Sequence, residues 1–252
     1  MSEKSLEDRM ANSKPLTVNL LSRKITIDLG LITVVLAILS LAGQTLKYTT
    51  DYEEAFGLIP LVNMAKALSI PTIFTVLVVF IVACLLGLIS MIKFREKDRF
   101  RCQWVGLTIF FFLFSLDKGS AISSYVFKQF RGFMRGFFPA YPNQKWVTTA
   151  VILLILIIGF YLAFIKSLPR AIKKQAFVSL AIYYAGFLFI ERFSDHFAAV
   201  NGYGNLEYNI LVTAGKTLEI FGLILCIQTL FDYLSIYQIE AAFSLSDHTK
   251  SP

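Results

Sequence analysis

Two short stretches place acids and bases inside otherwise apolar sequence. The first is FLFSLDKG, in which Asp117 and Lys118 follow a nearly unbroken apolar run. The second is TAGKTLEIFG, in which Lys216 and Glu219 stand three residues apart, a spacing that puts both side chains on one face of a helix. A charge at the centre of a bilayer costs about 2.5–3.5 kcal/mol, so it normally faces a helix bundle and finds a partner. We therefore expect these four residues to form one buried polar cluster.

Several kinds of chemistry are compatible with such a cluster, whose formal charges cancel. Opposite charges can clamp two helices together, because pairing makes their burial tolerable. Acids and bases within a membrane can also carry a proton or a solute, or act in catalysis. Alternatively, the lysine ammonium groups can extend to the membrane surface without meeting the acids. The residues favour the clamp, with a proton or solute pathway as the main alternative.

Other side chains that could bind a metal or perform catalysis do not gather in the sequence. The only histidines are His196 and His248, and the cysteines Cys84, Cys102 and Cys226 have no paired spacing. Neither a zinc site nor a disulfide framework is indicated. Gly-rich phosphate loops, nucleophile elbows and the HExxH motif are absent from the sequence. We predict no catalytic residue, no metal site and no cofactor.

The elements that must position the cluster follow from the composition. Of the 252 residues, 56% are hydrophobic and only 16% are charged, whereas soluble domains average about 25% charged. The apolar runs are continuous rather than alternating, which argues against a β-barrel. The net charge of +7 comes from basic residues that flank these runs, so we expect the lipid bilayer, and no nucleic acid, as partner.

Six apolar runs are long enough to cross a membrane, which takes about 20 residues. They cover residues 25–46, 70–92, 103–126, 147–165, 175–193 and 207–239. The fold class is therefore all-α, a polytopic membrane bundle of six helices in one domain at 25–239. A cytoplasmic N-terminal tail at 1–24 and a C-terminal tail at 240–252 flank it. Trp104 and Trp146 stand near span ends, as expected of interface anchors.

Lysines and arginines predict the orientation of the spans. They gather before the first span, between the second and third, and between the fourth and fifth, which predicts that both termini are cytoplasmic. Asp117 then lies about 14 residues, or about 21 Å, along the outward-running third span. Lys216 and Glu219 fall at a similar depth in the sixth span. Glu191 and Arg192, at the outer end of the fifth span, are peripheral to this cluster.

One loop departs from this charge rule. The segment YVFKQFRGFMRGFFPAYPNQKW, residues 125–146, is predicted outside yet interleaves bases with aromatic rings. Such a mixture is typical of a segment that lies in the headgroup layer, with rings toward the lipid and charges toward water. Docking of a membrane-protein partner and an ordinary solvated loop are the alternatives. The predicted lipid or partner contacts are Phe127, Lys128, Phe130, Arg131, Arg135 and Phe137.

Three stretches resemble a family of bacterial six-span membrane proteins with no established activity. They begin GLIPLVNMAKALSIPT, FLFSLDKG and GKTLEIFG, and the resemblance covers the chain from about Gly57 to Leu234. The family carries Ser-Leu-Asp-Glu in the third span, of which Ser115, Leu116 and Asp117 are present. It carries Leu-Glu-x-x-Gly in the sixth, a motif that this chain keeps.

The departures from that family pattern fall on its acidic positions. Lys118 stands where the family has an acid, and Ser123 and Ser124 replace a His-Glu pair. Gly215 and Lys216 replace two successive acids. In the family, these acids and the histidine would assemble a metal or proton site within a helix bundle. The resemblance therefore implies a divergent member that keeps the scaffold, has no metal site and has taken up another role.

These observations lead to an expected function with one alternative. We expect an integral membrane protein of the bacterial inner membrane, or of a thylakoid-like membrane, with a non-enzymatic role in binding a partner or an anionic lipid. The alternative is a small-solute or proton-coupled transporter that uses the intramembrane cluster of Asp, Lys and Glu. An intramembrane enzyme is a third hypothesis.

Overall fold

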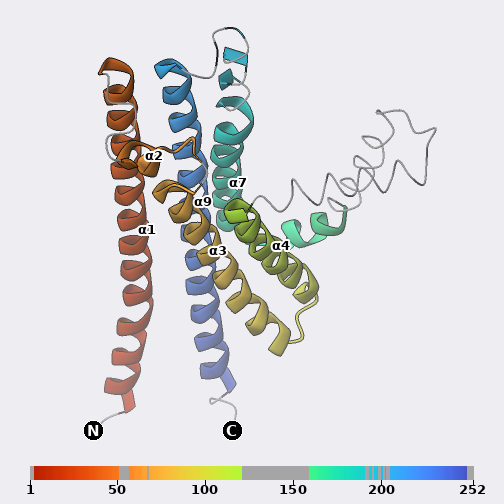
Figure 1. Cartoon of the computed structure of the whole chain (residues 1–252). Coiled ribbons are helices and arrows are strands. Elements are labelled where there is room, and N and C mark those ends of the chain that lie inside the picture. Colours follow the sequence, from red (N-terminus) through yellow and green to blue (C-terminus); the bar gives the residue numbers. More distant parts are fainter. Residues whose placement is uncertain are drawn as a thin grey trace, which may run out of the picture.

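The chain is helical in nearly all of the part that the computed structural model describes (Figure 1). That part comprises residues 3–50, 57–66, 68–120, 159–190 and 205–248, with 193–194, 196–197, 200 and 202; the side chains of 3–21, 188–190 and 236–248 fall outside it. Residues 159–167 are also helical. The named elements are α1 (Glu3–Thr49), α2 (Leu58–Val62), α3 (Ile70–Arg95), α4 (Arg101–Ser120), α7 (Arg170–Tyr184), the π-helix η2 (Ala185–Ile190) and α9 (Leu206–His248).

Within the described part of the chain, three helices are long and apolar enough to cross a membrane. They are Ser22–Thr49 within α1, Ile70–Arg95, which is all of α3, and Leu206–Ser235 within α9. Their length and composition indicate a membrane protein, and they coincide with the first, second and sixth predicted spans. The third prediction, 103–126, falls on α4 as far as Ser120, and the fifth, 175–193, falls on α7 and η2. Most of the fourth, 147–165, lies outside the described residues.

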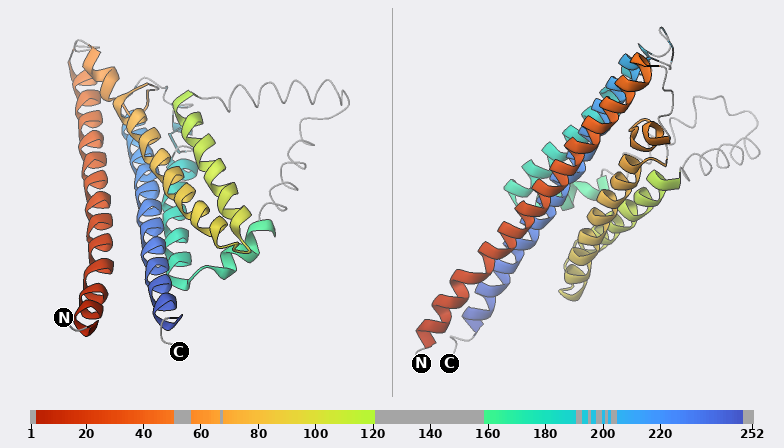
Figure 2. Two further views of the ribbon diagram at one scale, coloured as in Figure 1. Left: turned by 90° about the horizontal axis from the view of Figure 1, so that it is seen from below. Right: turned by 60° about the vertical axis from the view of Figure 1, so that its left-hand side comes forward.

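Helix α9 is the centre of the bundle, with α1 on one side and α7 on the other (Figures 1 and 2). Helix α1 runs antiparallel to α9: the Thr26 hydroxyl donates to the Gln228 side-chain oxygen at 2.7 Å, and the Asn209 amide donates to the Tyr48 hydroxyl at 3.2 Å. Because of this pairing, α1 begins and α9 ends at the same end of the bundle.

Helices α3 and α4 form an antiparallel hairpin that packs against α9 through α3. The turn between them includes Lys97, whose φ of 55° lies in the left-handed region. The Ser115 hydroxyl donates to the carbonyl oxygen of Val76 at 3.1 Å, which ties the two helices together near the far end of the hairpin. Helices α1, α4 and α7 therefore run in one direction, and α3 and α9 run in the other.

The buried core is aliphatic and lies along α3 and α9. Val78, Val79 and Val82 of α3 are fully buried, as is Ile227 of α9. Trp104 of α4 joins this core with only 5% of its surface exposed. The expectation of Trp104 as an interface anchor is therefore wrong in its placement: packed helices enclose most of its ring.

The face of helix α1 toward α9 carries several fully buried polar residues, and its outer face is largely apolar. Ser22, Thr33, Ser40 and Gln44 recur at helical spacing along the face toward α9, and each has 1% or less of its surface exposed. The opposite face carries exposed leucine, isoleucine and valine side chains from Ile27 to Leu46. Water would disfavour such a helix, whereas lipid favours it, because association within a bilayer depends on small and polar contact residues.

Several element boundaries differ from the predictions. Helix α9 continues to His248, beyond the predicted span end at 239 and into the predicted tail at 240–252. Helix α1 begins at Glu3, well before the predicted span at 25, because glutamate, lysine, arginine and alanine in the tail are good helix formers in water. Helix α7 begins at Arg170, directly after Pro169, whose ring and fixed φ suit the position before a helix. Apolar content marks the part of a helix that is in lipid, but helical hydrogen bonding continues beyond it.

Candidate functional site

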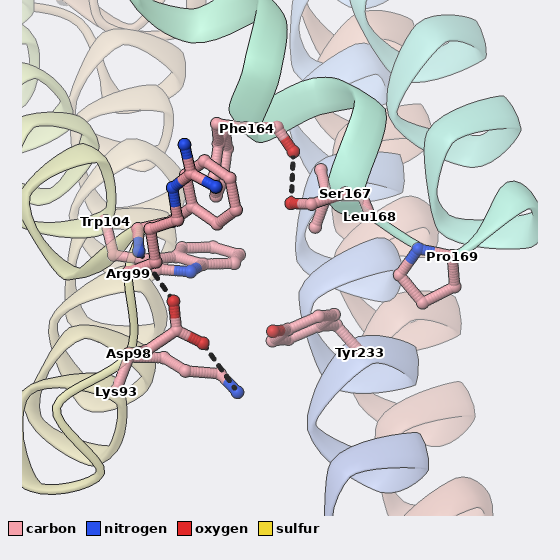
Figure 3. Close-up of a pocket in the computed structure, with 10 residues that line it drawn as sticks. Lys93, Asp98, Arg99, Trp104, Phe164, Ser167, Leu168, Pro169 and Tyr233 are labelled. Atoms are coloured by element: carbon pink, nitrogen blue, oxygen red, sulfur yellow. Dashed lines mark hydrogen bonds and ion pairs between the residues drawn. The ribbon is translucent and has the colours of Figure 1, made fainter.

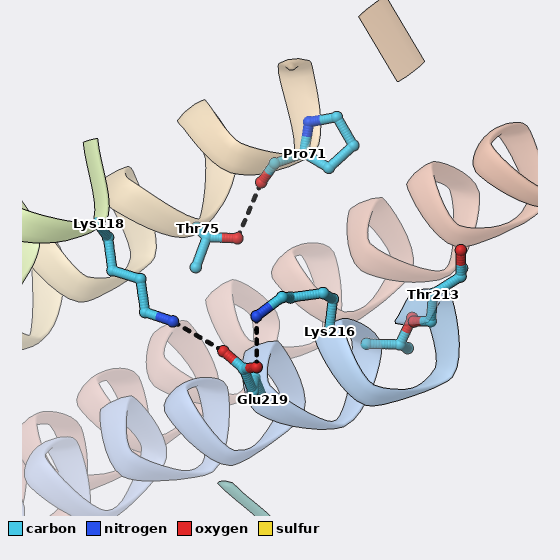
Figure 4. A network of polar contacts seen from close by, with 7 residues as sticks. Pro71, Thr75, Lys118, Thr213, Lys216 and Glu219 are labelled. Atoms are coloured by element: carbon cyan, nitrogen blue, oxygen red, sulfur yellow. Dashed lines mark hydrogen bonds and ion pairs between the residues drawn. The ribbon is translucent and has the colours of Figure 1, made fainter. Parts of the chain in front are cut away.

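The candidate site is the polar cluster on α9, near the end of the α3–α4 hairpin opposite to its turn. Lys216 and Glu219 lie one turn apart on α9, and the Glu219 side chain is almost completely buried, with 2% exposed. Lys118 reaches the same place from the last turn of α4 (Figure 4). Helical spacing fixes the first pair, whereas packing of the hairpin against α9 brings in Lys118.

Each oxygen of the Glu219 carboxylate has one ammonium partner. The Lys118 Nζ lies 2.8 Å from Oε2, and the Lys216 Nζ lies 2.8 Å from Oε1 (Figure 4). The Lys118 ammonium also lies 5.4 Å from the centre of the Phe114 ring, within the range of a cation–π interaction. These short charge-assisted bonds satisfy both oxygens of a carboxylate that is nearly closed to solvent.

Asp117 directly precedes Lys118 on α4. It is half-buried on α4, and successive residues of a helix do not face the same way. The described contacts therefore join Lys118, Lys216 and Glu219, a set of two bases and one acid. Of the other predicted residues, Glu191 and Arg192 lie outside the described residues. So do the predicted interfacial contacts Phe127, Lys128, Phe130, Arg131, Arg135 and Phe137.

Two glycines bring the backbone of α7 and η2 directly against α9 beside Glu219. A Cβ atom at Gly186 would lie 2.5 Å from the Gly215 carbonyl oxygen and 2.8 Å from the Glu219 amide nitrogen. A Cβ atom at Gly222 would lie 2.6 Å from the Tyr183 amide nitrogen. Neither position has room for a side chain. The chain therefore surrounds Glu219 with protein on the η2 side as well as on the α4 side.

Sequence reasoning did not identify the role of these glycines, although a signal was present. Gly186 and Gly222 both interrupt apolar runs, and small residues at such places mark close helix contacts in membranes. The Ser179 hydroxyl reinforces the same contact by donating to the Gly222 carbonyl oxygen at 2.7 Å. Gly222, the glycine of the Leu-Glu-x-x-Gly motif, therefore allows α7 to pack closely against α9 one turn after Glu219.

A second polar connection, also missed from the sequence, crosses three helices nearer the other end of the bundle. Gln175 of α7 donates to the Asp232 carboxylate at 2.9 Å, and Gln228 donates to its other oxygen at 3.1 Å. The oxygen of Gln228 in turn accepts from Thr26 of α1. In the sequence, the signal for these contacts is the spacing of Gln228 and Asp232, two polar residues four positions apart in an apolar run of α9.

The two ammonium groups stabilise the negative charge of the Glu219 carboxylate, and this arrangement is poorly suited to a metal ion. Two ammonium groups already occupy both carboxylate oxygens and would repel a cation. Among the described residues, no group of three His, Cys, Asp or Glu side chains is placed to hold a metal ion. The chemistry that the geometry supports is charge neutralisation across a helix contact.

Comparisons with known proteins give a family without an assigned activity. A protein-family model, described as Domain of unknown function (DUF8692), matches residues 29–234. Neither the curated proteins nor the solved structures contain a match. The matched range runs from the first apolar helix through Glu219 to the end of the apolar part of α9. The chain therefore belongs to the DUF8692 family, a family of unknown function.

Proposed function

We propose that the protein is a multi-pass integral membrane protein with a non-enzymatic role in binding lipid or a membrane partner. In this proposal six spans cross a bacterial inner membrane or a thylakoid-like membrane, and both termini are cytoplasmic. Three long apolar helices and the outward apolar face of α1 support membrane integration. The alternating directions of the helices and the shared end of α1 and α9 are compatible with this topology.

The main observation in favour of a structural role for the cluster is that both oxygens of the buried Glu219 carboxylate are already paired. Each of its oxygens has an ammonium partner at 2.8 Å. A catalytic or transporting acid needs to exchange a partner for a substrate or a proton. An acid held by two bases is instead suited to clamp α4 onto α9, beside the close glycine contact between η2 and α9.

Lys118 of this clamp is close in sequence to the segment that we propose makes the functional contacts. Lys118 stands two residues before the end of α4 at Ser120, and the basic and aromatic segment 125–146 follows shortly afterwards. The clamp thus holds the end of α4, which is the last described residue before this segment in the chain. The proposed contacts with anionic headgroups are made by Phe127, Lys128, Phe130, Arg131, Arg135 and Phe137.

A pair of neighbouring single-cysteine variants tests this role. In a chain whose native cysteines are replaced by alanine, Phe130→Cys and Arg131→Cys are reconstituted in vesicles of phosphatidylcholine with phosphatidylglycerol. A water-soluble maleimide is expected to label Arg131→Cys much faster than Phe130→Cys, because rings point toward lipid and charges toward water. Pure phosphatidylcholine vesicles should reduce the difference, since they lack the anionic headgroups.

Two other outcomes have defined meanings. Equal rapid labelling of both cysteines in either vesicle would contradict the proposal, since it is what a solvated loop gives. Protection of both cysteines in native membranes, lost after purification, would point to a protein partner in place of lipid.

Transport is the second candidate, and one observation favours it: Glu219 is an ionisable group buried in a helix long and apolar enough to span a membrane. The test is proton or solute flux into proteoliposomes. A transporter should lose flux in Glu219→Gln and Asp117→Asn while keeping its fold, whereas Glu207→Gln, an exposed acid on the same helix, should not matter. A clamp predicts no flux in the wild type.

A further inference from the structure

A cavity of about 370 Å³ lies at the end of the bundle opposite to the Glu219 cluster. It opens where the α3–α4 turn, the segment 164–169 and α9 meet, with Asp98, Arg99 and Trp104 on one side and Tyr233 on the other (Figure 3). None of the residues discussed for the cluster lines this cavity. Its volume is within the range of about 300–1,000 Å³ that is usual for small-ligand sites.

Aromatic rings from α4, the segment 164–169 and α9 pack together along the cavity. The Trp104 ring meets the Phe164 ring edge-on, with centres 4.9 Å apart, and the Tyr233 ring at 5.0 Å. Trp104 and Phe164 are 5% and 4% exposed, so neighbouring helices hold both rings in place. A preformed apolar wall of this kind suits the uncharged part of a ligand.

The two basic residues that line the cavity, Lys93 and Arg99, differ in whether an acid neutralises them. Lys93 forms ion pairs with Glu96 at 3.3 Å and with Asp98 at 3.6 Å, and these two carboxylates more than offset its single charge. Arg99 is exposed, and no carboxylate of the described residues lies within ion-pair distance of it. Its guanidinium lies 5.7 Å from the Phe100 ring. Arg99 is thus the cavity's available cation, beside an aromatic surface.

The surroundings of the cavity strengthen its preference for an anion. Arg95 and Lys97 near the α3–α4 turn, and Lys166 and Arg170 before and at the start of α7, are all exposed at this end of the bundle. A guanidinium binds the oxygens of a phosphate in a bidentate manner, which a lysine ammonium cannot do. The available space admits a phosphate with a glycerol unit but not two acyl chains.

We infer that this cavity binds a phosphate ester, the headgroup of an anionic phospholipid, with the phosphate on Arg99 and the glycerol against Trp104 and Phe164. The acyl chains would extend outside the cavity along the apolar helix surfaces. This inference rests on the proposed membrane integration, which cysteine labelling tests independently, but on neither the clamp nor the segment 125–146.

Native mass spectrometry of the full chain in a non-ionic detergent tests the inference. Phosphatidylglycerol is expected to stay bound to the wild type more tightly than phosphatidylcholine. Arg99→Gln should weaken phosphatidylglycerol binding by about tenfold or more, because it removes a charge-assisted contact. The matched control is Arg95→Gln, which removes an exposed arginine from the same end of the bundle but outside the cavity and should change binding less than about twofold.

A size variant separates the cavity from general attraction to positive charge. Ser167 lines the cavity and is exposed, so Ser167→Phe should fill the space while leaving every charge in place. Loss of phosphatidylglycerol in this variant is expected. Equal losses in Arg99→Gln and Arg95→Gln, or no preference over phosphatidylcholine, would overturn the inference even if Ser167→Phe does not fold, since Arg99 is exposed and its removal leaves the packing intact.

Soluble glycerol 3-phosphate distinguishes the two sources of the ester. Competition by millimolar glycerol 3-phosphate, lost in Arg99→Gln, would assign the site to the phosphate ester itself, from a soluble source as well as from lipid. If it does not compete while phosphatidylglycerol binds through Arg99, the ligand is the lipid, whose chains add contacts along the helix surfaces.

Discussion

At the scale of single residues, Glu219 is a buried side chain that is held through both of its carboxylate oxygens. Its two lysine partners are unequal: Lys118 comes from another helix and has 19% of its side chain exposed, whereas Lys216 is on the same helix and has 33% exposed. The interhelical pair should therefore contribute more to the stability of the fold than the pair within α9.

Substitutions in this cluster should rank in a defined order. Glu219→Gln leaves two ammonium groups facing a neutral amide, and breaking a buried pair in this way costs about 3–5 kcal/mol. We expect Glu219→Gln to lower the thermal unfolding temperature in detergent most, Lys118→Met less, and Lys216→Met least. Glu207→Gln, at an exposed position of α9, is the control and should have little effect. An unchanged melting temperature in Glu219→Gln would refute the clamp.

Glycine substitutions test the contact behind Glu219. Gly222→Ala should destabilise the fold, because its Cβ atom would lie 2.6–2.8 Å from the backbone and Cβ atoms of Tyr183. Gly30→Ala is the matched control, since its Cβ atom would make an ordinary contact at 3.8 Å and alanine favours a helix over glycine by about 1 kcal/mol. Opposite shifts in unfolding temperature are expected; a neutral Gly222→Ala would argue against close packing of α7 and α9.

At the scale of elements, side-chain hydrogen bonds join α1 to α9, although both helices are mostly apolar. The Ser40 hydroxyl accepts from the Met64 amide at 3.1 Å and lies 3.3 Å from the Thr213 hydroxyl. One serine thus connects α1, the loop after α2, and α9. Gly43, one turn further on, lets α2 approach α1 closely, with the Val62 side chain 3.3 Å from the position of a Cβ atom.

Removing that serine tests the contact. Ser40→Ala leaves the buried Met64 amide without its acceptor, which should cost about 1–3 kcal/mol. Thr45→Ala, an exposed position whose hydroxyl donates to the carbonyl of its own helix, should cost much less. Unfolding in detergent followed by circular dichroism measures both variants. Equal losses would mean that the contact between α1 and α9 does not depend on Ser40.

At the scale of the whole molecule, the described helices give each end of the bundle a different character. One end holds the Glu219 cluster and the short helix α2, and the other holds the α3–α4 turn with its basic residues and the aromatic cavity. In the proposed topology the basic end is cytoplasmic, because positively charged loops are retained on that side.

Cysteine labelling tests this orientation with a residue that the chain already has. Cys102 is exposed at the start of α4, at the basic end. With Cys84 and Cys226 replaced by alanine, an impermeant maleimide should label Cys102 in inverted vesicles but not in right-side-out ones. In a chain without native cysteines, Lys66→Cys, exposed after α2, should show the opposite pattern. The same pattern for both would reject the topology.

Much of the fold followed from local patterns. Apolar runs predicted the helices α1, α3 and α9, since only a helix satisfies its own backbone within lipid. The change to π-helix at Ala185–Ile190 was not predictable, because it depends on how η2 meets α9 at Gly186. Trp104 was misassigned for a similar reason: position near a span end says nothing about which way a ring points.

The sequence alone determined the all-helical class, the length of the apolar helices and the placing of Lys216 and Glu219 on one helical face, because all three depend on spacing of a few residues. The tertiary structure decided that Lys118 meets Glu219, 101 positions further along the chain. It also decided that residues from the α3–α4 turn, the segment 164–169 and α9 enclose one cavity. Such contacts depend on the rotation and register of packed helices, which no local pattern encodes.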